Sequence, residues 1–126
     1  MVMKTQEIIN YTFENPLMNI TLLVGLIFIV AGLIMFKFPP KKINSLYGYR
    51  TNSSMKNQSR WDFAQKYSSK EMIKLGFVLM ITSIIGLITN FDNLTNIFLG
   101  LGLMILIVII LIFRVEKAIK TKFSDE

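Results

Sequence analysis

The stretch LMNITLLVGLIFIVAGLIMF, residues 17–36, decides the class of this protein. It carries no charge, and a helix of about 20 residues crosses the ~30 Å hydrocarbon layer of a bilayer. Two further apolar runs follow at residues 72–89 and 94–113, and Lys74 is the only charged residue in either. Because unpaired backbone groups are very costly in lipid and none of the runs alternates, we expect three transmembrane helices rather than barrel strands.

The rest of the composition agrees with one membrane domain. The chain has 126 residues, of which 52% are hydrophobic, and these residues are clustered rather than spread periodically as in a soluble domain. We therefore predict an all-α integral membrane protein whose single domain covers residues 1–126, with a long polar loop at 37–71 and a tail at 114–126. The first run is too long for a secretory signal and lacks a small-residue cleavage site, so we expect it to be retained.

Local signals predict where the helices begin. Asn15 precedes Pro16, which places a capping side chain just before a proline at the first helical position. Residues 68–71, Ser-Ser-Lys-Glu, are typical of a capping box that opens the second span, with Ser68 as the cap. Asp92 or Asn93 is suited to cap the third span. The short segment 90–93 predicts a tight turn, so the second and third spans should form an antiparallel hairpin.

The distribution of charge predicts the orientation. The net charge is +6, and the basic residues gather in the long loop and the tail, whereas the N-terminal segment has only Lys4 and the 90–93 turn has none. Cytoplasmic loops carry an excess of Lys and Arg, so we expect the loop and the C-terminus in the cytoplasm and the N-terminus outside. The basic residues concerned are Lys37, Lys41, Lys42, Arg50, Lys56, Arg60, Lys66, Lys70, Arg114, Lys117, Lys120 and Lys122.

Several classes of chemistry are excluded or disfavoured. The chain has no cysteine and no histidine, so disulfides, thiolate chemistry, haem and most zinc sites are ruled out, and we expect no metal and no cofactor. The basic loop has no recognition-helix or RNA-binding motif, so we expect contact with the lipid bilayer and no direct nucleic acid. Asp62 and Glu71 are the only acids in the loop and have no partner for acid–base work, so we expect no enzymatic activity.

The loop itself predicts a short helix at the membrane surface. Pro39 and Pro40 should end the first span. From a cap at Ser53 or Ser54, apolar residues recur near helical spacing as far as Tyr67, which predicts a short amphipathic interfacial helix. Trp61 is then most simply a membrane-interface anchor. Asn57 lies one turn before it, so the two could form a joint polar and aromatic surface.

Before this helix lies a segment that amphipathicity does not explain. Gly48 stands between two aromatic residues, which suggests a turn or a close backbone approach. Arg50 offers five donors in a planar fork, and three roles are open to it: contact with a lipid phosphate, a bond to carbonyls at a helix C-terminus, or recognition of a partner's carboxylate.

The order of these residues resembles the signature loop of the SdpI family of bacterial membrane proteins. The pattern is Gly-aromatic-Arg-Thr, then Ser-x-x-Asn, then Trp-x-x-Ala, followed by a transmembrane helix. Family members often carry Pro after the Arg-Thr pair, where this chain has Asn52. The resemblance identifies as candidate partner-binding or toxin-binding residues Gly48, Tyr49, Arg50, Thr51, Ser54, Asn57, Trp61 and Ala64.

The resemblance implies an immunity function in the bacterial cytoplasmic membrane. The namesake protects its producer from a small secreted toxic peptide, and it signals by holding a cytosolic transcriptional repressor at the membrane. The implied partners are therefore a peptide toxin and such a repressor. Two other functions stay open: a membrane sensor without an immunity role, and a structural subunit of a larger membrane complex.

Small residues in the spans predict close helix packing. Gly25 and Gly32 share one face of the first span, and the Thr21–Gly25 and Thr82–Gly86 pairs have the small-xxx-small spacing. These faces suit packing within one chain or in a homodimer that would rebuild a six-span unit, and the sequence leaves both open. The spans contain no Asp, Glu, His or Arg, which argues against a proton-coupled transporter.

Overall fold

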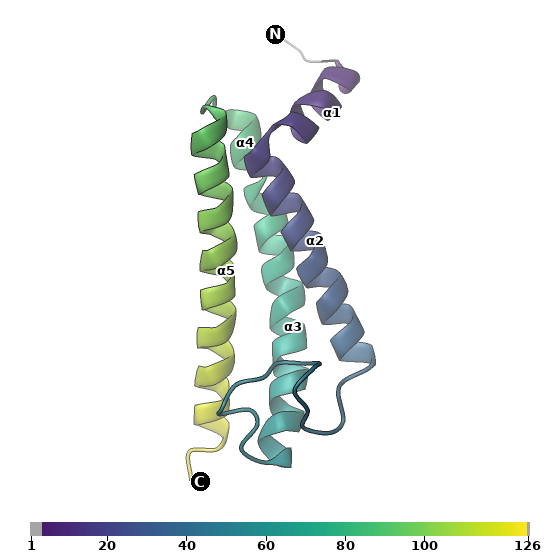
Figure 1. Ribbon diagram of the computed structural model, residues 1–126, viewed down its shortest axis with the longest axis vertical. Coiled ribbons are helices and arrows are strands. Elements are labelled where there is room, and N and C mark those ends of the chain that lie inside the picture. Colours follow the sequence, from purple (N-terminus) through teal and green to yellow (C-terminus); the bar gives the residue numbers. More distant parts are fainter. Residues whose placement is uncertain (1–3, 126) are drawn as a thin grey trace.

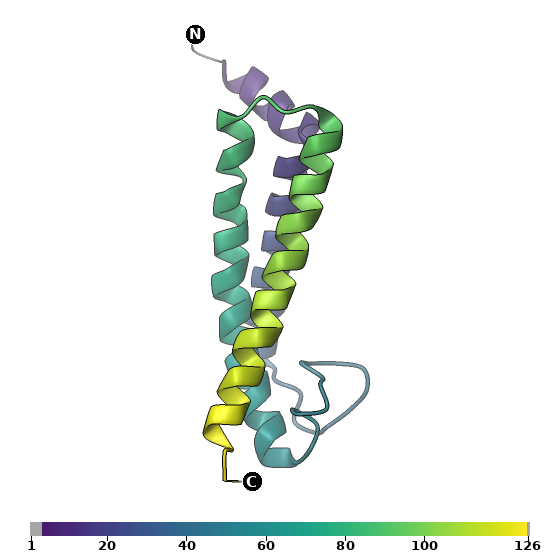
Figure 2. The same cartoon turned by 90° about the vertical axis from the view of Figure 1, so that its left-hand side faces the viewer.

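Three long helices run side by side along the molecule (Figures 1 and 2). The computed structural model describes residues 4–125, and within that part the chain is all-helical. Its elements are α1 (Thr5–Glu14), α2 (Pro16–Lys37), α3 (Gln58–Thr82), α4 (Ile84–Ile88) and α5 (Asn93–Lys122). Three segments are long and apolar enough to span a membrane: Pro16–Lys37, Gln58–Ile88 and Asn93–Lys122. The predicted all-α membrane protein with three spans is confirmed.

The predicted caps of the first and third spans are also confirmed. The Asn15 side chain accepts hydrogen bonds from the backbone N–H groups of Leu17 (3.0 Å) and Met18 (3.4 Å), with Pro16 at the start of α2. Asp92 caps α5 by accepting from the Thr95 N–H at 3.3 Å. Each cap satisfies donors that have no partner inside the helix, and together they fix the α2 start and the antiparallel turn from α4 into α5.

The second span differs from the prediction at both ends. The helix does not begin at residue 68 or 72 but at Gln58, with Asn57 as its cap, and it runs unbroken to Thr82. The prediction of a separate interfacial helix from Ser53 or Ser54 to Tyr67 is therefore wrong, because residues 58–67 form the first turns of α3. Neither proline nor glycine interrupts the chain between Gln58 and Leu75, so the helix continues from the polar segment into the apolar one.

The predicted capping box at residues 68–71 is wrong for the same reason. Ser68 lies in the middle of α3, where its hydroxyl donates to the carbonyl of Gln65 at 3.2 Å. Glu71 does not reach back to the Ser68 backbone but pairs with Arg114 of α5. A long-range ion pair has displaced the local interaction that the sequence suggested.

α1 and α4 complete the end of the molecule opposite the loop. α1 is a separate helix that is angled away from α2 (Figure 1), and it was not predicted from the sequence. Ser83 separates α3 from α4. The Gly86 carbonyl of α4 accepts hydrogen bonds from the Tyr11 hydroxyl (3.0 Å) and the Asn15 amide (3.4 Å). These bonds hold the junction of α1 and α2 against α4.

Glycines bring α2 and α3 into backbone contact. A Cβ built on Gly76 would lie 2.7 Å from the Gly25 carbonyl oxygen, and one on Gly32 would lie 2.8 Å from the Ser69 carbonyl oxygen. Gly25 and Gly32 thus serve packing within one chain, so a homodimer would have to use another face. On its other side α3 packs against α5 through the buried cluster Ala64, Leu75, Leu79, Ile107, Leu111, Val115 and Ile119.

The outer faces of the bundle remain apolar. Large side chains such as Leu23, Phe77 and Phe113 are exposed on α2, α3 and α5. A soluble domain does not leave patches of this size uncovered, so lipid is the natural neighbour of these faces. The outward apolar surface and the three long helices together describe a multi-pass membrane protein.

Candidate functional site

The loop between α2 and α3, residues 38–57, lies at the end of the molecule where α3 begins and α5 ends (Figures 1 and 2). The Tyr47 hydroxyl donates to the Phe38 carbonyl at 2.8 Å, and the Asn44 side chain accepts from the N–H groups of Leu46 and Tyr47. The Gln58 amide donates to the Lys41 carbonyl at 2.6 Å. The loop therefore has a defined fold of its own, built from turn-forming side chains.

Gln65 of α3 holds the centre of the loop. Its Oε1 accepts from the Tyr49 N–H at 2.6 Å, and its Nε2 donates to the Tyr49 carbonyl at 2.7 Å. Gly48 has φ +111°, a region that favours glycine, and a Cβ there would lie 2.5 Å from Gln65 Oε1. Of the two alternatives predicted for Gly48, the close backbone approach is confirmed, and the group that it approaches is the Gln65 amide.

Thr51 and Ser54 close a tight turn next to this point. The Ser54 Oγ accepts from the Thr51 N–H at 2.9 Å and contacts the carbonyls of Tyr49 and Thr51 at 3.1 Å, while the Ser54 N–H donates to Thr51 Oγ1. Ser54 is fully buried. Both of these predicted site residues therefore shape the backbone, but only the buried Ser54 has no surface to offer a ligand, because Thr51 is half-buried.

Asn57 and Trp61 also have structural roles. The Asn57 side chain accepts from the Arg60 N–H at 2.9 Å as the cap of α3. Trp61 is fully buried, and its Nε1 donates to the Pro40 carbonyl at 2.7 Å. The prediction of Trp61 as a membrane-interface anchor is wrong, as is the joint surface with Asn57, because the indole attaches the start of the loop to α3.

Ala64 and Tyr49 join the loop to the buried core. Ala64 is fully buried in the α3–α5 cluster, and Tyr49 packs against that cluster. Burial, and after it the Glu116 carboxylate, raise the pKa of the Tyr49 phenol above its ordinary value. The ring therefore stays neutral and packs between the loop and the buried cluster of α3 and α5.

Arg50 is the member of the predicted set that faces outward. It is exposed, and its Nη1 donates to the carbonyl of Ser45 within the loop. That carbonyl does not belong to a helix C-terminus, so the predicted role at a helix end is wrong. Contact of the guanidinium with a lipid phosphate or with a partner's carboxylate remains a prediction.

An apolar pocket of about 350 Å³ lies directly beside this arginine. Its walls come from the three long helices, through Met35 of α2, Met72 of α3, and Val108, Leu111 and Ile112 of α5, and the segment 48–51 forms its edge. These wall residues lie near the ends of the predicted spans. The pocket thus combines an apolar interior at the edge of the bilayer with one guanidinium at its entrance.

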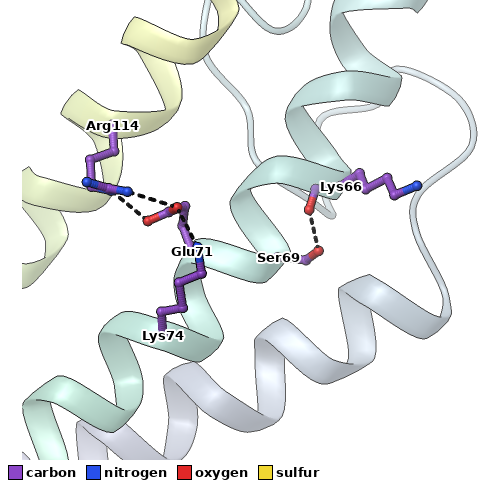
Figure 3. Close-up of polar contacts among 5 residues, drawn as sticks. All are labelled: Lys66, Ser69, Glu71, Lys74 and Arg114. Carbon is purple, nitrogen blue, oxygen red and sulfur yellow. Dashed lines mark hydrogen bonds and ion pairs between the residues drawn. The ribbon is translucent and has the colours of Figure 1, made fainter.

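An ion pair fastens α5 to α3 close to this pocket (Figure 3). Arg114 Nε donates to Glu71 Oε2 at 2.7 Å and Nη2 donates to Oε1 at 3.2 Å, and Lys74 Nζ lies 3.4 Å from Oε1. The Glu71 side chain is 4% exposed and that of Arg114 is 50% exposed. Neither this pair nor the role of Gln65 was predicted from the sequence. An acid just before one apolar run and an arginine just after another, at the same membrane boundary, could have indicated it.

Replacing Gln65 with leucine is expected to destabilise the loop. The Tyr49 N–H would lose its partner while its carbonyl would keep Ser54, so one buried donor is left unpaired at a cost of about 2 kcal/mol. Protection of residues 45–56 in hydrogen exchange should fall accordingly, by about thirtyfold. Lys66→Leu serves as the control, because Lys66 is the next residue of the same helix and its side chain is exposed. Equal protection in wild type and Gln65→Leu would contradict the assigned role.

Comparisons with known proteins agree with this geometry. The model of the SdpI/YfhL protein family matches residues 41–114. The uncharacterized protein YfhL of Bacillus subtilis (strain 168) is 49% identical over 55 residues, which are 44% of this chain and 50% of that protein. The chain thus spans about half the length of this curated relative. No solved structure matches this chain. Because the family model covers more than half of the chain, including the whole segment from Gly48 to Ala64, this protein belongs to the SdpI/YfhL family.

Proposed function

We propose that this protein is a membrane immunity protein that protects its cell from a secreted, membrane-active peptide toxin by binding it, without catalysis. Membership of the SdpI/YfhL family supports an immunity-type role. The single observation that carries the proposal is the pocket at the bilayer edge, whose entrance is formed by residues 48–51 of the predicted motif. The internal hydrogen bonds of the loop keep this entrance in place.

The chemistry of the pocket suits such a ligand. A membrane-active peptide has apolar side chains, which the walls formed by Met72, Val108 and Leu111 would cover. A peptide also has a terminal carboxylate, which the Arg50 guanidinium can bind through two hydrogen bonds. The other motif residues act by holding the loop, so in this proposal Arg50 is the member that contacts the toxin.

We propose that the loop faces the cytoplasm of a bacterial cell. The basic residues from Lys37 to Lys70 belong to the end of α2, the loop and the first half of α3, and those from Arg114 to Lys122 to the end of α5. Lys4 is the residue before α1, and α1 lies at the opposite end of the bundle (Figure 1). The positive-inside bias then directs the loop and the C-terminus inward. The toxin would accordingly be intercepted from the inner leaflet, before it disrupts the membrane.

Loss of toxin protection in pocket variants tests the proposal. Cells of a sensitive bacterium expressing the wild type should survive a challenge with secreted peptide toxins, and Arg50→Ala and Val108→Phe should each lower survival at least about tenfold. Tenfold weaker binding corresponds to a loss of about 1.4 kcal/mol, which one charged contact or a filled pocket can account for. Survival is measured at matched levels of the protein in the membrane.

Ile109→Phe is the matched control. Ile109 follows Val108 in α5 and is likewise exposed, but it does not line the pocket, so the same substitution there should leave protection unchanged. Absence of protection by the wild type against every toxin tested would refute the immunity function for those peptides. Equal loss in Val108→Phe and Ile109→Phe would remove the pocket from the mechanism.

A second candidate function is recruitment of a soluble transcriptional repressor to the membrane. It is favoured by Leu46, which is 89% exposed in the loop and so presents a large apolar side chain to its surroundings. Protection alone needs no cytosolic partner, whereas recruitment does. Co-purification of a cytosolic protein in the presence of toxin, and its loss in Leu46→Ser, would distinguish signalling from protection or from a purely structural subunit.

A further inference from the structure

A second cleft, separate from the pocket beside Arg50, opens between α3 and α5. It has a volume of about 370 Å³ and is lined by Tyr67, Arg114, Lys117, Ala118, Thr121 and Lys122. Three of these residues are cations, two carry hydroxyl groups, and none is an acid. A donor set of this kind is suited to an anion with several oxygen atoms.

Glu71 offsets the charge of Arg114 but leaves the charges of Lys117 and Lys122 in the cleft. The carboxylate takes the Nε and Nη2 donors of Arg114, which fixes the plane of the guanidinium, and Nη1 takes no part in this pair. The Arg114 side chain is half-exposed, whereas Glu71 is buried behind it. The ion pair therefore positions the arginine, whose half-exposed side chain lines the cleft beside Tyr67.

The position of the cleft along the bundle identifies the kind of anion. Arg114 comes directly after the apolar run that ends at Phe113, and Lys117 follows one turn later, roughly 5 Å further along the axis. That distance is similar to the depth of the headgroup layer outside the hydrocarbon core. Below the cleft, Phe113 exposes an apolar side chain along which an acyl chain can lie.

Further lysines surround the entrance. Lys70 and Lys74 follow Tyr67 on α3 with spacings of three and seven residues, which places them on the same side of that helix. The Lys74 side chain is 67% exposed. On the outer side, Lys122 Nζ lies 5.2 Å from the centre of the Phe63 ring. The cleft is thus the centre of a basic surface at the membrane boundary.

We propose that this cleft binds the phosphate of one anionic phospholipid headgroup. Lys117, the exposed edge of Arg114 and the hydroxyl of Tyr67 hold the phosphate oxygen atoms, and the acyl chains lie against the exposed face of α5. The site would place a bound lipid between α3 and α5, on the exposed side of the Glu71–Arg114 pair. This inference does not depend on the toxin proposal, because it uses different residues and a different ligand.

Lipid titration of the purified full chain tests the site. Phosphatidylglycerol added in mild detergent should bind saturably, as followed by native mass spectrometry, and Lys117→Gln/Lys122→Gln should weaken binding by about tenfold to thirtyfold. The control Lys42→Gln/Lys56→Gln removes the same charge from exposed loop positions outside this cleft and should bind as the wild type does. Circular dichroism confirms that each variant is folded.

Three outcomes would overturn the proposal. Equal weakening in the two double variants would show general attraction between charges and no site. Phosphatidylcholine binding as tightly as phosphatidylglycerol would remove the requirement for a net negative headgroup. Competition by glycerol 3-phosphate at the affinity of the lipid would make the ligand a soluble phosphate and not a membrane lipid.

Discussion

Replacing Gly76 with alanine is expected to lower the free energy of unfolding by about 3 kcal/mol, at the upper end of the usual cost of overpacking. The new Cβ would lie 2.7 Å from the Gly25 carbonyl oxygen and 3.0 Å from the Ile29 backbone nitrogen. Both obstacles are backbone atoms of α2, so no side-chain rotation can relieve the clash and the two helices must separate. Unfolding of the purified protein in mixed detergent micelles, followed by circular dichroism, measures the effect.

Gly102→Ala is the control, and its expected effect on stability has the opposite sign. Gly102 lies in the middle of α5, and a Cβ built there meets nothing within 4 Å. Alanine favours the helix over glycine by roughly 0.5–1 kcal/mol, so this variant should be as stable as the wild type or slightly more stable. If both variants lost the same stability, the cost would come from the change of residue type and not from the contact of α2 with α3.

A hydropathy pattern shows which part of a helix lies in lipid, but it does not show where the helix begins. The sequence could therefore predict the number of spans but not the start of the second one. The three apolar runs gave the number of spans, and the caps at Asn15 and Asp92 gave two helix starts. The apolar run of the second span marks only the part that lies in lipid, whereas α3 begins fourteen residues before Met72, at Gln58. When a helix continues from water into lipid without a break, the residues at the membrane boundary carry no signal of a helix start.

The site shows a similar division between local and long-range information. The sequence predicted a turn or a close backbone approach at Gly48, because local residues determine such features. The motif residues were grouped by their resemblance to the SdpI family. It assigned Trp61 to the bilayer surface and Glu71 to a cap, whereas the structure pairs Trp61 with Pro40 and Glu71 with Arg114. Both partners are distant in sequence, and one sequence alone does not reveal such pairings.

These pairings suggest a common design for the loop end of the bundle. Gln65 and Trp61 attach the loop to α3, and Glu71 attaches α5 to the same helix through Arg114. The loop and α5, which both line the pocket, are therefore positioned against α3. A change that loosens α5 from α3 should alter the Val108–Ile112 wall of the pocket without touching the loop.

Arg114→Met is accordingly the second variant with a large expected effect. It leaves the nearly buried Glu71 carboxylate with only Lys74, at 3.4 Å, and breaking a buried ion pair commonly costs 3–5 kcal/mol. Because Arg114 is half-exposed and Lys74 remains, we expect the free energy of unfolding to fall by about 3 kcal/mol. Lys74→Met removes only a mostly exposed partner and should cost less than about 1 kcal/mol.

The double variant Glu71→Met/Arg114→Met decides whether an unpaired charge is the cause. Apolar residues of similar volume often replace a buried ion pair with little change in stability, so most of the loss in Arg114→Met should be recovered. Recovery would show that the pair specifies how α5 docks on α3 while contributing little net stability. If the double variant were as unstable as Arg114→Met, the guanidinium would be stabilising α5 through contacts other than Glu71, and the attachment of α5 by this pair would be refuted.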